Sequence, residues 1–245
     1  MERWWMPLKA DTVTKDFISD TTVFADIFNY YIYGGEQVIQ PGQLAERSPE
    51  KITLPYGADG AAVPFQRFRD VQKLYTAMTD GEMEYVLYGV ESQAEVHYAA
   101  AVKNNLYDAI EYAVQVEEAA KSHRRAMKQA KEETDSLKGL ERKLPSPGEF
   151  LSGFWEGDCL IPSVTVMVYF GVDAWKGPMS LFDMMKVKDQ RIFAFMDNYH
   201  VRLIAPALME DEEIMRFQSN LREVMFFIKY SRDKDNLSRI LDANE

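Results

Sequence analysis

The stretch "EYVLYGVESQ", residues 84–93, decides how the rest of the chain is interpreted. It is apolar over most of its length, as an interior strand is, yet it ends on a carboxylate, Glu91, and an amide, Gln93. Side chains two positions apart share one face of a strand. The stretch therefore predicts a buried strand that delivers both polar groups to one edge of a sheet.

The preceding segment, "FQRFRDVQKLY" (65–75), is a second strand candidate with Asp70 near its middle. The short "TDGE" between the two segments favours an antiparallel pair, which would bring Asp70 and Glu91 together at one rim. Two carboxylates held close together repel each other unless a cation lies between them, and oxygen ligands suit Mg²⁺ or Mn²⁺. By spacing alone the commoner alternative stays open, in which strand-end carboxylates pair with lysine or arginine.

The remaining elements alternate between helix and strand, which predicts an α/β fold. A helix is expected over 15–33, with Ser19, Asp20 or Thr21 as candidate caps of its main segment and with its end at Gly34-Gly35. Asp26 and Asn29 lie off its apolar stripe. The other expected elements are a short strand in the loop 36–65 at "EQVIQ", a helix from 99 past 118, strands at 162–171 and 199–206, and helices at 210–229 and 232–242.

Residues 121–143 differ in composition from the rest of the chain. They hold eight basic and four acidic residues in a chain whose net charge is −11. A solvated helical hairpin is the plainer interpretation, and contact between DNA phosphates and Lys121, Arg124, Arg125 and Lys128 is the functional one. We expect a single domain over 1–245, with 119–150 as a basic helical insertion.

Composition excludes several classes of protein. The acidic balance argues against a general nucleic-acid coat and an anionic membrane surface, although it leaves room for a local basic groove. Cys159 is the sole cysteine, so an intrachain disulfide and a cysteine metal cluster are excluded. The longest apolar run is far too short to span a bilayer. We therefore expect a cytoplasmic protein that does not enter a membrane.

Short motifs along nearly the whole chain carry a family resemblance. They are "FADIFN" (24–29), "VIQPGQL" (38–44), "RDVQK" (69–73), "YGVESQ" (88–93), "YDAIEYAVQ" (107–115), "GDCLIPSVTVMVYFG" (157–171), "WKGPMSL" (175–181), "LIAP" (203–206) and "IKYSRDKDNL" (228–237). In order and spacing the chain resembles the Rpn family of recombination-promoting nucleases, also called YhgA-like transposases, of the PD-(D/E)XK superfamily.

The resemblance implies a restriction-endonuclease-like core: a central mixed β-sheet flanked by helices, in the order helix, three strands, helix, strand, with further C-terminal helices. It also implies a Mg²⁺-dependent (or Mn²⁺-dependent) DNA endonuclease linked to mobile elements, recombination or defence. A homodimer is one option for its assembly. The label "transposase" is no evidence for strand transfer.

The family motif aligns with the residues that open this section. Asp70 and Glu91 take the positions of the metal ligands, and the backbone carbonyl of Ser92 is expected near the metal. Gln93 stands where the superfamily has lysine; a glutamine cannot act as a base, but it can hold a water in line. These residues would perform phosphodiester hydrolysis.

Further candidates come from the helices. Asp26 aligns with an acidic residue on the superfamily's first helix, and Tyr112 and Gln115 lie on the helix after the motif. Family members often carry Met-Pro-x-Arg before "YDA". Here residues 100–103 are Ala-Ala-Val-Lys, so the proline is lost and the positive charge is kept by Lys103. Asp108 is expected to face solvent.

Two other functions remain open. A catalytically weak or inactive nuclease fold that binds DNA or a partner protein is favoured by Gln93 and by the altered element at 100–103. A plain structural interaction domain is mildly favoured by the net charge. His97, four residues beyond the motif, could touch substrate or metal, although a loop histidine is commoner.

Overall fold

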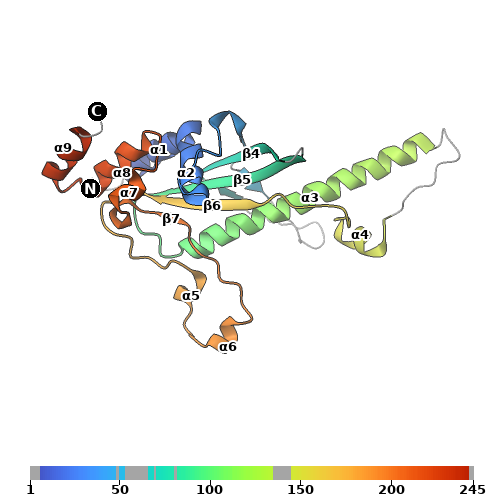
Figure 1. Cartoon of the computed structure of the whole chain (residues 1–245). Coiled ribbons are helices and arrows are strands. Elements are labelled where there is room, and N and C mark those ends of the chain that lie inside the picture. Colours follow the sequence, from blue (N-terminus) through green and yellow to red (C-terminus); the bar gives the residue numbers. More distant parts are fainter. Residues whose placement is uncertain are drawn as a thin grey trace.

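The computed structural model describes residues 6–47, 50–52, 66–68, 70–79, 82–134 and 145–242. They form an α/β fold around a five-stranded mixed sheet in the order β1-β4-β5-β6-β7 (Figure 1). β1, β4 and β5 are antiparallel neighbours, whereas β5, β6 and β7 run parallel. The strands are β1 Leu44–Glu46, β4 Val71–Thr79, β5 Glu82–Gln93, β6 Ser163–Tyr169 and β7 Leu203–Ile204, and β2 Glu50–Ile52 pairs with β3 Gln66–Phe68 in a separate antiparallel sheet.

Helices cover both faces of the sheet. A helix (Thr21–Tyr33), the strands β4 and β5, a long helix (Ala100–Thr134) and β6 follow one another as the sequence predicts, whereas β1 lies at 44–46 and not at the expected 36–40. The arrangement is compatible with a restriction-endonuclease-like core. The α-helices are α1 Met6–Ser19, α2 Thr21–Tyr33, α3 Ala100–Thr134, α4 Pro147–Ser152, α5 Leu181–Met184, α6 Gln190–Phe193, α7 Asp211–Ile214, α8 Leu221–Lys229 and α9 Lys234–Asp242, with 3₁₀ turns at Pro41–Gln43 and Pro206–Leu208.

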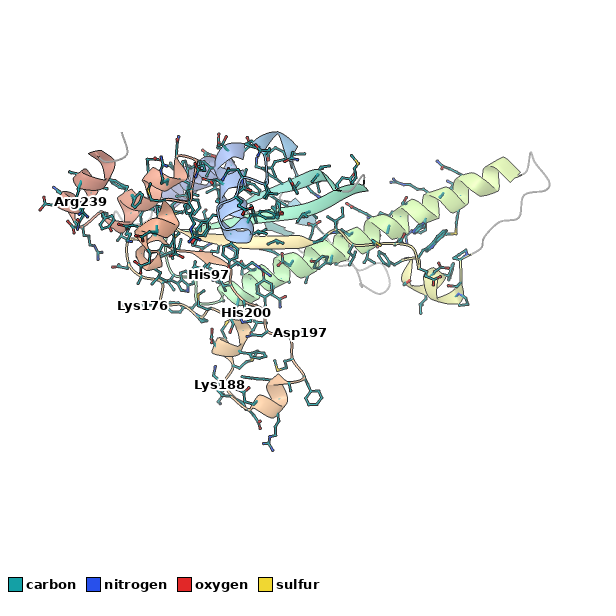
Figure 2. All side chains as sticks on the ribbon, in the orientation of Figure 1. His97, Lys176, Lys188, Asp197, His200 and Arg239 are labelled. Atoms are coloured by element: carbon teal, nitrogen blue, oxygen red, sulfur yellow. The ribbon has the colours of Figure 1, made fainter. Side chains whose placement is uncertain are left out.

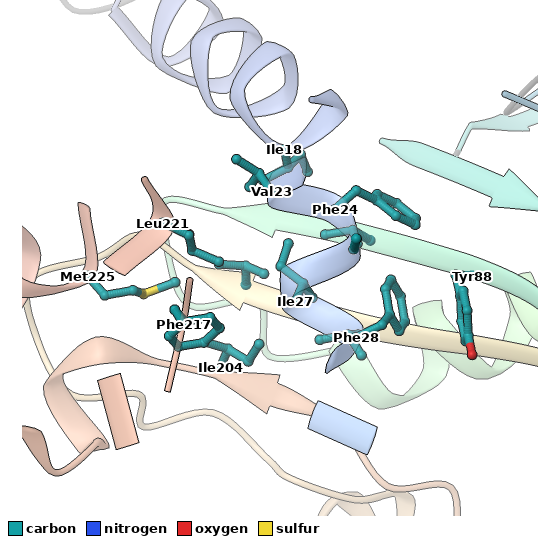
Figure 3. Close-up of a cluster of buried hydrophobic side chains, with 14 of the residues drawn as sticks. Ile18, Val23, Phe24, Ile27, Phe28, Tyr88, Ile204, Phe217, Leu221 and Met225 are labelled. Carbon is teal, nitrogen blue, oxygen red and sulfur yellow. The ribbon is translucent and has the colours of Figure 1, made fainter. Parts of the chain in front are cut away.

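The larger apolar core lies on the α2 side of the sheet. Phe24, Ile27 and Phe28 of α2 pack against the strands and against the C-terminal helices (Figure 3). The ring of Phe28 stacks on Tyr88 of β5 with centroids 4.2 Å apart. Burial of this aromatic area stabilises the contact between α2 and the sheet.

The predicted helix over 15–33 is two helices. Asp20 separates them and accepts hydrogen bonds from the N–H groups of Thr22 and Val23, as an N-cap does. Gly34 ends α2 with φ 66°, a left-handed conformation that glycine adopts without strain. Asp26 and Asn29 are buried although they lie off the apolar stripe, because residues 23–29 of α2 are buried without exception.

α3 is the longest element, with 35 residues and a length of about 52 Å. It crosses the other face of the sheet and continues well beyond it (Figure 1). Since α3 runs through residue 119 without a break, the basic segment begins inside this helix rather than at a new element. The predicted hairpin partner over 135–144 lies outside the described residues.

Several predicted boundaries need correction. "EQVIQ" (36–40) is not a strand, the strand expected at 199–206 spans only β7, and residues 210–229 hold two helices, α7 and α8. β4 begins at Val71, so Asp70 lies at a bend before the strand instead of near its middle. The strands at 84–93 and 162–171 and the helix at 232–242 are confirmed.

Between β6 and β7 the chain makes an excursion that carries α5 and α6 away from the sheet (Figure 1). Its base is closed by an antiparallel bridge between Ser180 and His200. No helix in the described parts of the chain combines the length and the apolar character needed to cross a bilayer.

Candidate active site at the rim of the sheet

Asp70 and Glu91 meet where β4 begins and β5 approaches its end. The last ladder partners are Val71 and Val90, so the next positions outward are Asp70 and Glu91. The predicted antiparallel pairing is confirmed, and it places Asp70, just before β4, and Glu91 of β5 at one rim. The carboxyl end of β6, which runs parallel to β5, lies at the same edge, and such edges commonly hold the sites of α/β proteins.

The Asp70 carboxylate is held by the strand opposite. Its Oδ2 accepts hydrogen bonds from the Ser92 N–H at 2.8 Å and from the Ser92 hydroxyl at 3.1 Å. The Thr14 hydroxyl of α1 donates in turn to Ser92 Oγ at 3.5 Å. The N–H and C=O groups of a strand residue point toward the same neighbour, so the Ser92 carbonyl is directed to the Asp70 side as well. Nothing in the sequence pattern singled out Thr14.

Glu91 lies on the opposite face from Ser92, under α3. Its side chain is 1% exposed and forms an ion pair with Lys103, whose Nζ is 2.7 Å from Glu91 Oε2. Burial acts to lower the pKa of Lys103, but the attraction and hydrogen bond of Glu91, with a weaker contribution from Asp70, outweigh it and raise that pKa. Lys103 is therefore a charged ammonium within electrostatic reach of both carboxylates.

Gln93 shares the α3 face with Glu91 and is half-buried at the last position of β5. Its backbone carbonyl accepts a hydrogen bond from the Phe170 N–H at 2.8 Å, which ties the end of β5 to the end of β6. The amide is thus presented from a fixed backbone beside Glu91.

A cavity of about 550 Å³ opens beside Lys103. Lys103 Nζ also lies 5.7 Å from the centre of the Tyr107 ring, within cation–π range. The lining residues are His97, Ala99, Val102, Lys103, Leu106 and Tyr107. Of the residues at the rim, Lys103 therefore borders this cavity.

His97 lines this cavity and lies near the start of α3 (Figure 2). Burial and the positive charge of Lys103 both lower the pKa of His97. At neutral pH its imidazole is therefore uncharged, and it can exchange hydrogen bonds with a substrate but adds no positive charge.

Asp108 is buried, so the prediction that it faces solvent is wrong. Its Oδ1 accepts hydrogen bonds from Ser163 Oγ at 3.1 Å and Thr165 Oγ1 at 2.8 Å, and its Oδ2 accepts one from the Tyr199 hydroxyl at 2.7 Å. Burial and the adjacent Asp108 carboxylate raise the pKa of Tyr199. Asp108 therefore fixes α3, β6 and the base of the excursion to one another.

A second buried carboxylate, Glu111, lies one turn further along α3. It accepts a hydrogen bond from Gln72 Nε2 at 3.0 Å and faces Arg47 at 3.5 Å. Sequence reasoning missed it, because its partners come from β4 and from the residue after β1. Buried polar groups thus join α3 to the sheet alongside an apolar cluster that includes Ala100, Ala101 and Met167.

Tyr112 and Gln115 lie away from the motif. The Tyr112 hydroxyl accepts a hydrogen bond from the Ser163 N–H at 3.1 Å, and the Gln115 amide makes two hydrogen bonds with the backbone of Ile161. Both side chains therefore hold the beginning of β6, whereas Glu91 pairs with Met167 near its end. The structure does not bring these two residues to the site.

Asp26 serves a different part of the fold. Its Oδ2 accepts hydrogen bonds from the N–H groups of Gln218 and Ser219 at 2.8 and 2.7 Å, and from the Ser219 hydroxyl at 2.7 Å. It lies on α2, which covers the opposite face of the sheet from Glu91 and α3. These contacts make Asp26 an anchor for the turn that begins α8.

Asp26→Ala should therefore affect stability rather than metal binding. Three donors to a buried carboxylate would lose their acceptor, and we expect the free energy of unfolding to fall by about 3 kcal/mol. Urea denaturation measures this loss, and Asp26→Asn, which keeps an acceptor oxygen, is the matched control with a smaller loss. If Asp26→Ala instead kept its stability and lost Mn²⁺ affinity, Asp26 would belong to the metal site.

The basic residues in the second half of α3 lie beyond the sheet (Figure 1). Lys121 and Arg124 both face Glu117, at 3.6 and 3.2 Å, while Arg125 and Lys128 are exposed. Lys121, Arg124, Arg125 and Lys128 are called the basic arm below. Nearby, His123 contacts Asp158 at 2.8 Å and stacks on Trp155, which fastens the segment after α4 to this part of the helix.

The donor set at the rim fits a hard divalent cation. Asp70 and Glu91 supply carboxylate oxygens, and Mg²⁺ is commonly bound by one or two carboxylates together with water and substrate phosphate. Within the described residues no group of three or more His, Cys, Asp or Glu side chains gathers as a metal cluster. The ammonium of Lys103 shows that this rim already attracts positive charge.

No family model, no curated protein and no solved structure matches this chain.

Proposed function

We propose that this protein is a Mg²⁺-dependent DNA endonuclease of the Rpn type. One observation carries the proposal: Asp70 and Glu91 occupy facing positions at one rim of the sheet, with Gln93 and Lys103 beside them. The resemblance of the motifs to the Rpn nucleases and the restriction-endonuclease-like order of elements support the same reaction. Mobile elements, recombination or defence are the settings in which such an enzyme acts.

The carboxylates of Asp70 and Glu91 and the backbone carbonyl of Ser92 would hold the metal. When bound, Mg²⁺ or Mn²⁺ polarises a phosphoryl oxygen and lowers the pKa of a coordinated water. Ser92 keeps the Asp70 carboxylate turned toward the rim through two hydrogen bonds, at 2.8 and 3.1 Å. Such fixed ligands reduce the reorganisation that the reaction requires.

Gln93 and Lys103 supply the other groups that the reaction needs. The Gln93 amide, held at the end of β5, can orient the attacking water by a hydrogen bond but cannot accept its proton. The Lys103 ammonium borders the cavity, where it can neutralise charge that develops on the phosphate. The nucleotide beside the cleaved bond can occupy this cavity.

The basic arm is the proposed binding surface for more distant phosphates. Replacing Lys121, Arg124, Arg125 and Lys128 by glutamine should weaken binding to all DNA sequences alike, because phosphates carry no sequence information. The salt dependence of binding should flatten by about 0.9 for each phosphate that the variant no longer neutralises. Fluorescence anisotropy at several salt concentrations measures the slope.

Lys186→Gln, which replaces an exposed lysine on the excursion, is the control for loss of positive charge elsewhere. Identical salt slopes for the parent and the arm variant would show that the arm is only a solvated part of α3.

A second function stands beside the first: a nuclease fold that binds DNA or a protein and cleaves weakly or not at all. The observation that favours it is the Glu91–Lys103 ion pair, which already neutralises one of the two carboxylates. The test is incubation of the pure protein with supercoiled plasmid in Mg²⁺, Mn²⁺ or Ca²⁺. An endonuclease should relax the plasmid with Mg²⁺ and Mn²⁺, whereas a binding module should shift its mobility without cutting it.

A further inference from the structure

The ammonium of Lys103 lies where the proposed metal would meet Glu91. Its Nζ is 2.7 Å from Glu91 Oε2, and Asp70 is close enough to attract it as well. We propose that Lys103 is a displaceable internal counter-ion, which neutralises Glu91 in the metal-free protein and leaves it when a divalent cation binds. The inference rests on the proposed metal site and adds a regulation to it.

Burial explains why the metal-free fold needs a cation at this point. The Glu91 side chain is 1% exposed, and an uncompensated carboxylate at that depth is strongly destabilising. Lys103 reaches Glu91 from the first turn of α3 and compensates this charge. The helix and the strand therefore dock with their charges already paired, before any metal arrives.

Electrostatics then makes the two cations compete. A divalent ion and an ammonium at one carboxylate repel each other strongly, because a buried site screens charge far less than water does. The ammonium must therefore move away from Glu91, and the cost of this movement lowers the apparent metal affinity.

The structure offers a place for the displaced side chain. Lys103 itself lines the cavity of about 550 Å³, and its side chain is 24% exposed. The Tyr107 ring, 5.7 Å from Nζ, can hold the ammonium by a cation–π contact. Metal binding would therefore turn the positive charge from Glu91 toward the space that a substrate phosphate enters. The metal would therefore bind first, and Lys103 would turn toward the substrate phosphate afterwards.

The experiment is calorimetric titration of the full chain with Mn²⁺. Lys103→Met and Lys103→Gln remove the competing charge, and each is expected to bind Mn²⁺ about tenfold more tightly than the parent, which corresponds to about 1.4 kcal/mol. Lys186→Met, which removes one exposed positive charge from the excursion, is the control and should bind as the parent does. Equal or weaker affinity in both Lys103 variants would overturn the inference.

Thermal unfolding gives a second readout that does not depend on activity. Without metal, Lys103→Met should unfold roughly 5 °C below the parent, because Glu91 loses its counter-ion. Saturating Mn²⁺ should raise its Tm by more than it raises that of the parent. A Tm rise no larger than that of the parent counts against displacement.

These outcomes separate the inference from the proposed function. If the parent and both Lys103 variants bind Mn²⁺ equally, the metal site stands and the counter-ion role falls. If none of them binds Mn²⁺, the proposed metal site and the inference fall together. If affinity rises while plasmid cleavage is lost, Lys103 both competes with the metal and serves the reaction.

Discussion

Glu91→Gln is expected to reduce Mg²⁺-dependent nicking of supercoiled plasmid by about a thousandfold or more. The substitution keeps the size of the side chain and deletes its charge. A metal contributes several kcal/mol to transition-state stabilisation, and each 1.36 kcal/mol is a factor of about ten in rate. Asp70→Asn should have a similar effect, since it deletes the second anionic ligand while its amide oxygen can still accept from Ser92.

The matched control is Glu95→Gln, which changes an exposed carboxylate four residues beyond Glu91. It changes the net charge equally and should leave nicking unchanged. Circular dichroism confirms that each variant is folded. Glu91→Gln protein that nicks at the parent rate would show that the cleavage comes from a contaminating nuclease.

Gln93→Ala is expected to lower cleavage by about a hundredfold without loss of Mn²⁺ binding. The amide is presented from the end of β5, whose backbone is tied to Phe170. Misplacement of a reacting group by about 1 Å can cost about 10²-fold in rate. The measurement is the initial rate of plasmid relaxation at saturating Mg²⁺, together with the Mn²⁺ affinity.

Gln93→Lys tests the role of Gln93 more sharply than Gln93→Ala does. It restores the residue that the superfamily carries and adds a charge that can stabilise the transition state. We expect it to match or exceed the parent rate. If the parent, Gln93→Ala and Glu91→Gln all nick at one rate, the protein is a binding module.

The strands were predictable because their signals are local. "EYVLYGVESQ" and "PSVTVMVYFG" are long apolar runs, and an interior strand shields both of its faces. Asp20 and Gly34 likewise mark the ends of α2 through short-range capping. Patterns of this range decide the order of the elements and hence the rim where Asp70 and Glu91 meet.

The polar contacts of the site were not predictable, because their partners are distant in sequence. Asp108 can be buried because the hydroxyl groups of Ser163, Thr165 and Tyr199 donate hydrogen bonds to its carboxylate. Asp26 accepts hydrogen bonds from a turn more than 190 residues away. That turn lies between α7 and α8, so the segment 210–229 is not one helix. Spacing along one helix carries no signal for such partners.

For the basic segment, composition was misleading, because it gave no sign that the preceding helix continues into the segment. Residues 121–134 have few large apolar side chains, which favoured a separate insertion, yet α3 continues through them. Pairing of Glu117 with Lys121 at four residues' spacing and with Arg124 supports an exposed helix. An exposed helix needs no apolar stripe, so periodicity could not find its end.

The account rests on the claim that the rim formed by Asp70 and Glu91 binds a divalent metal. The most direct measurement is calorimetric titration of the parent, Asp70→Asn and Glu91→Gln with Mn²⁺. The account predicts a bound ion in the parent and loss of most affinity in each variant, because each deletes an anionic ligand. Unchanged affinity in both variants would contradict it.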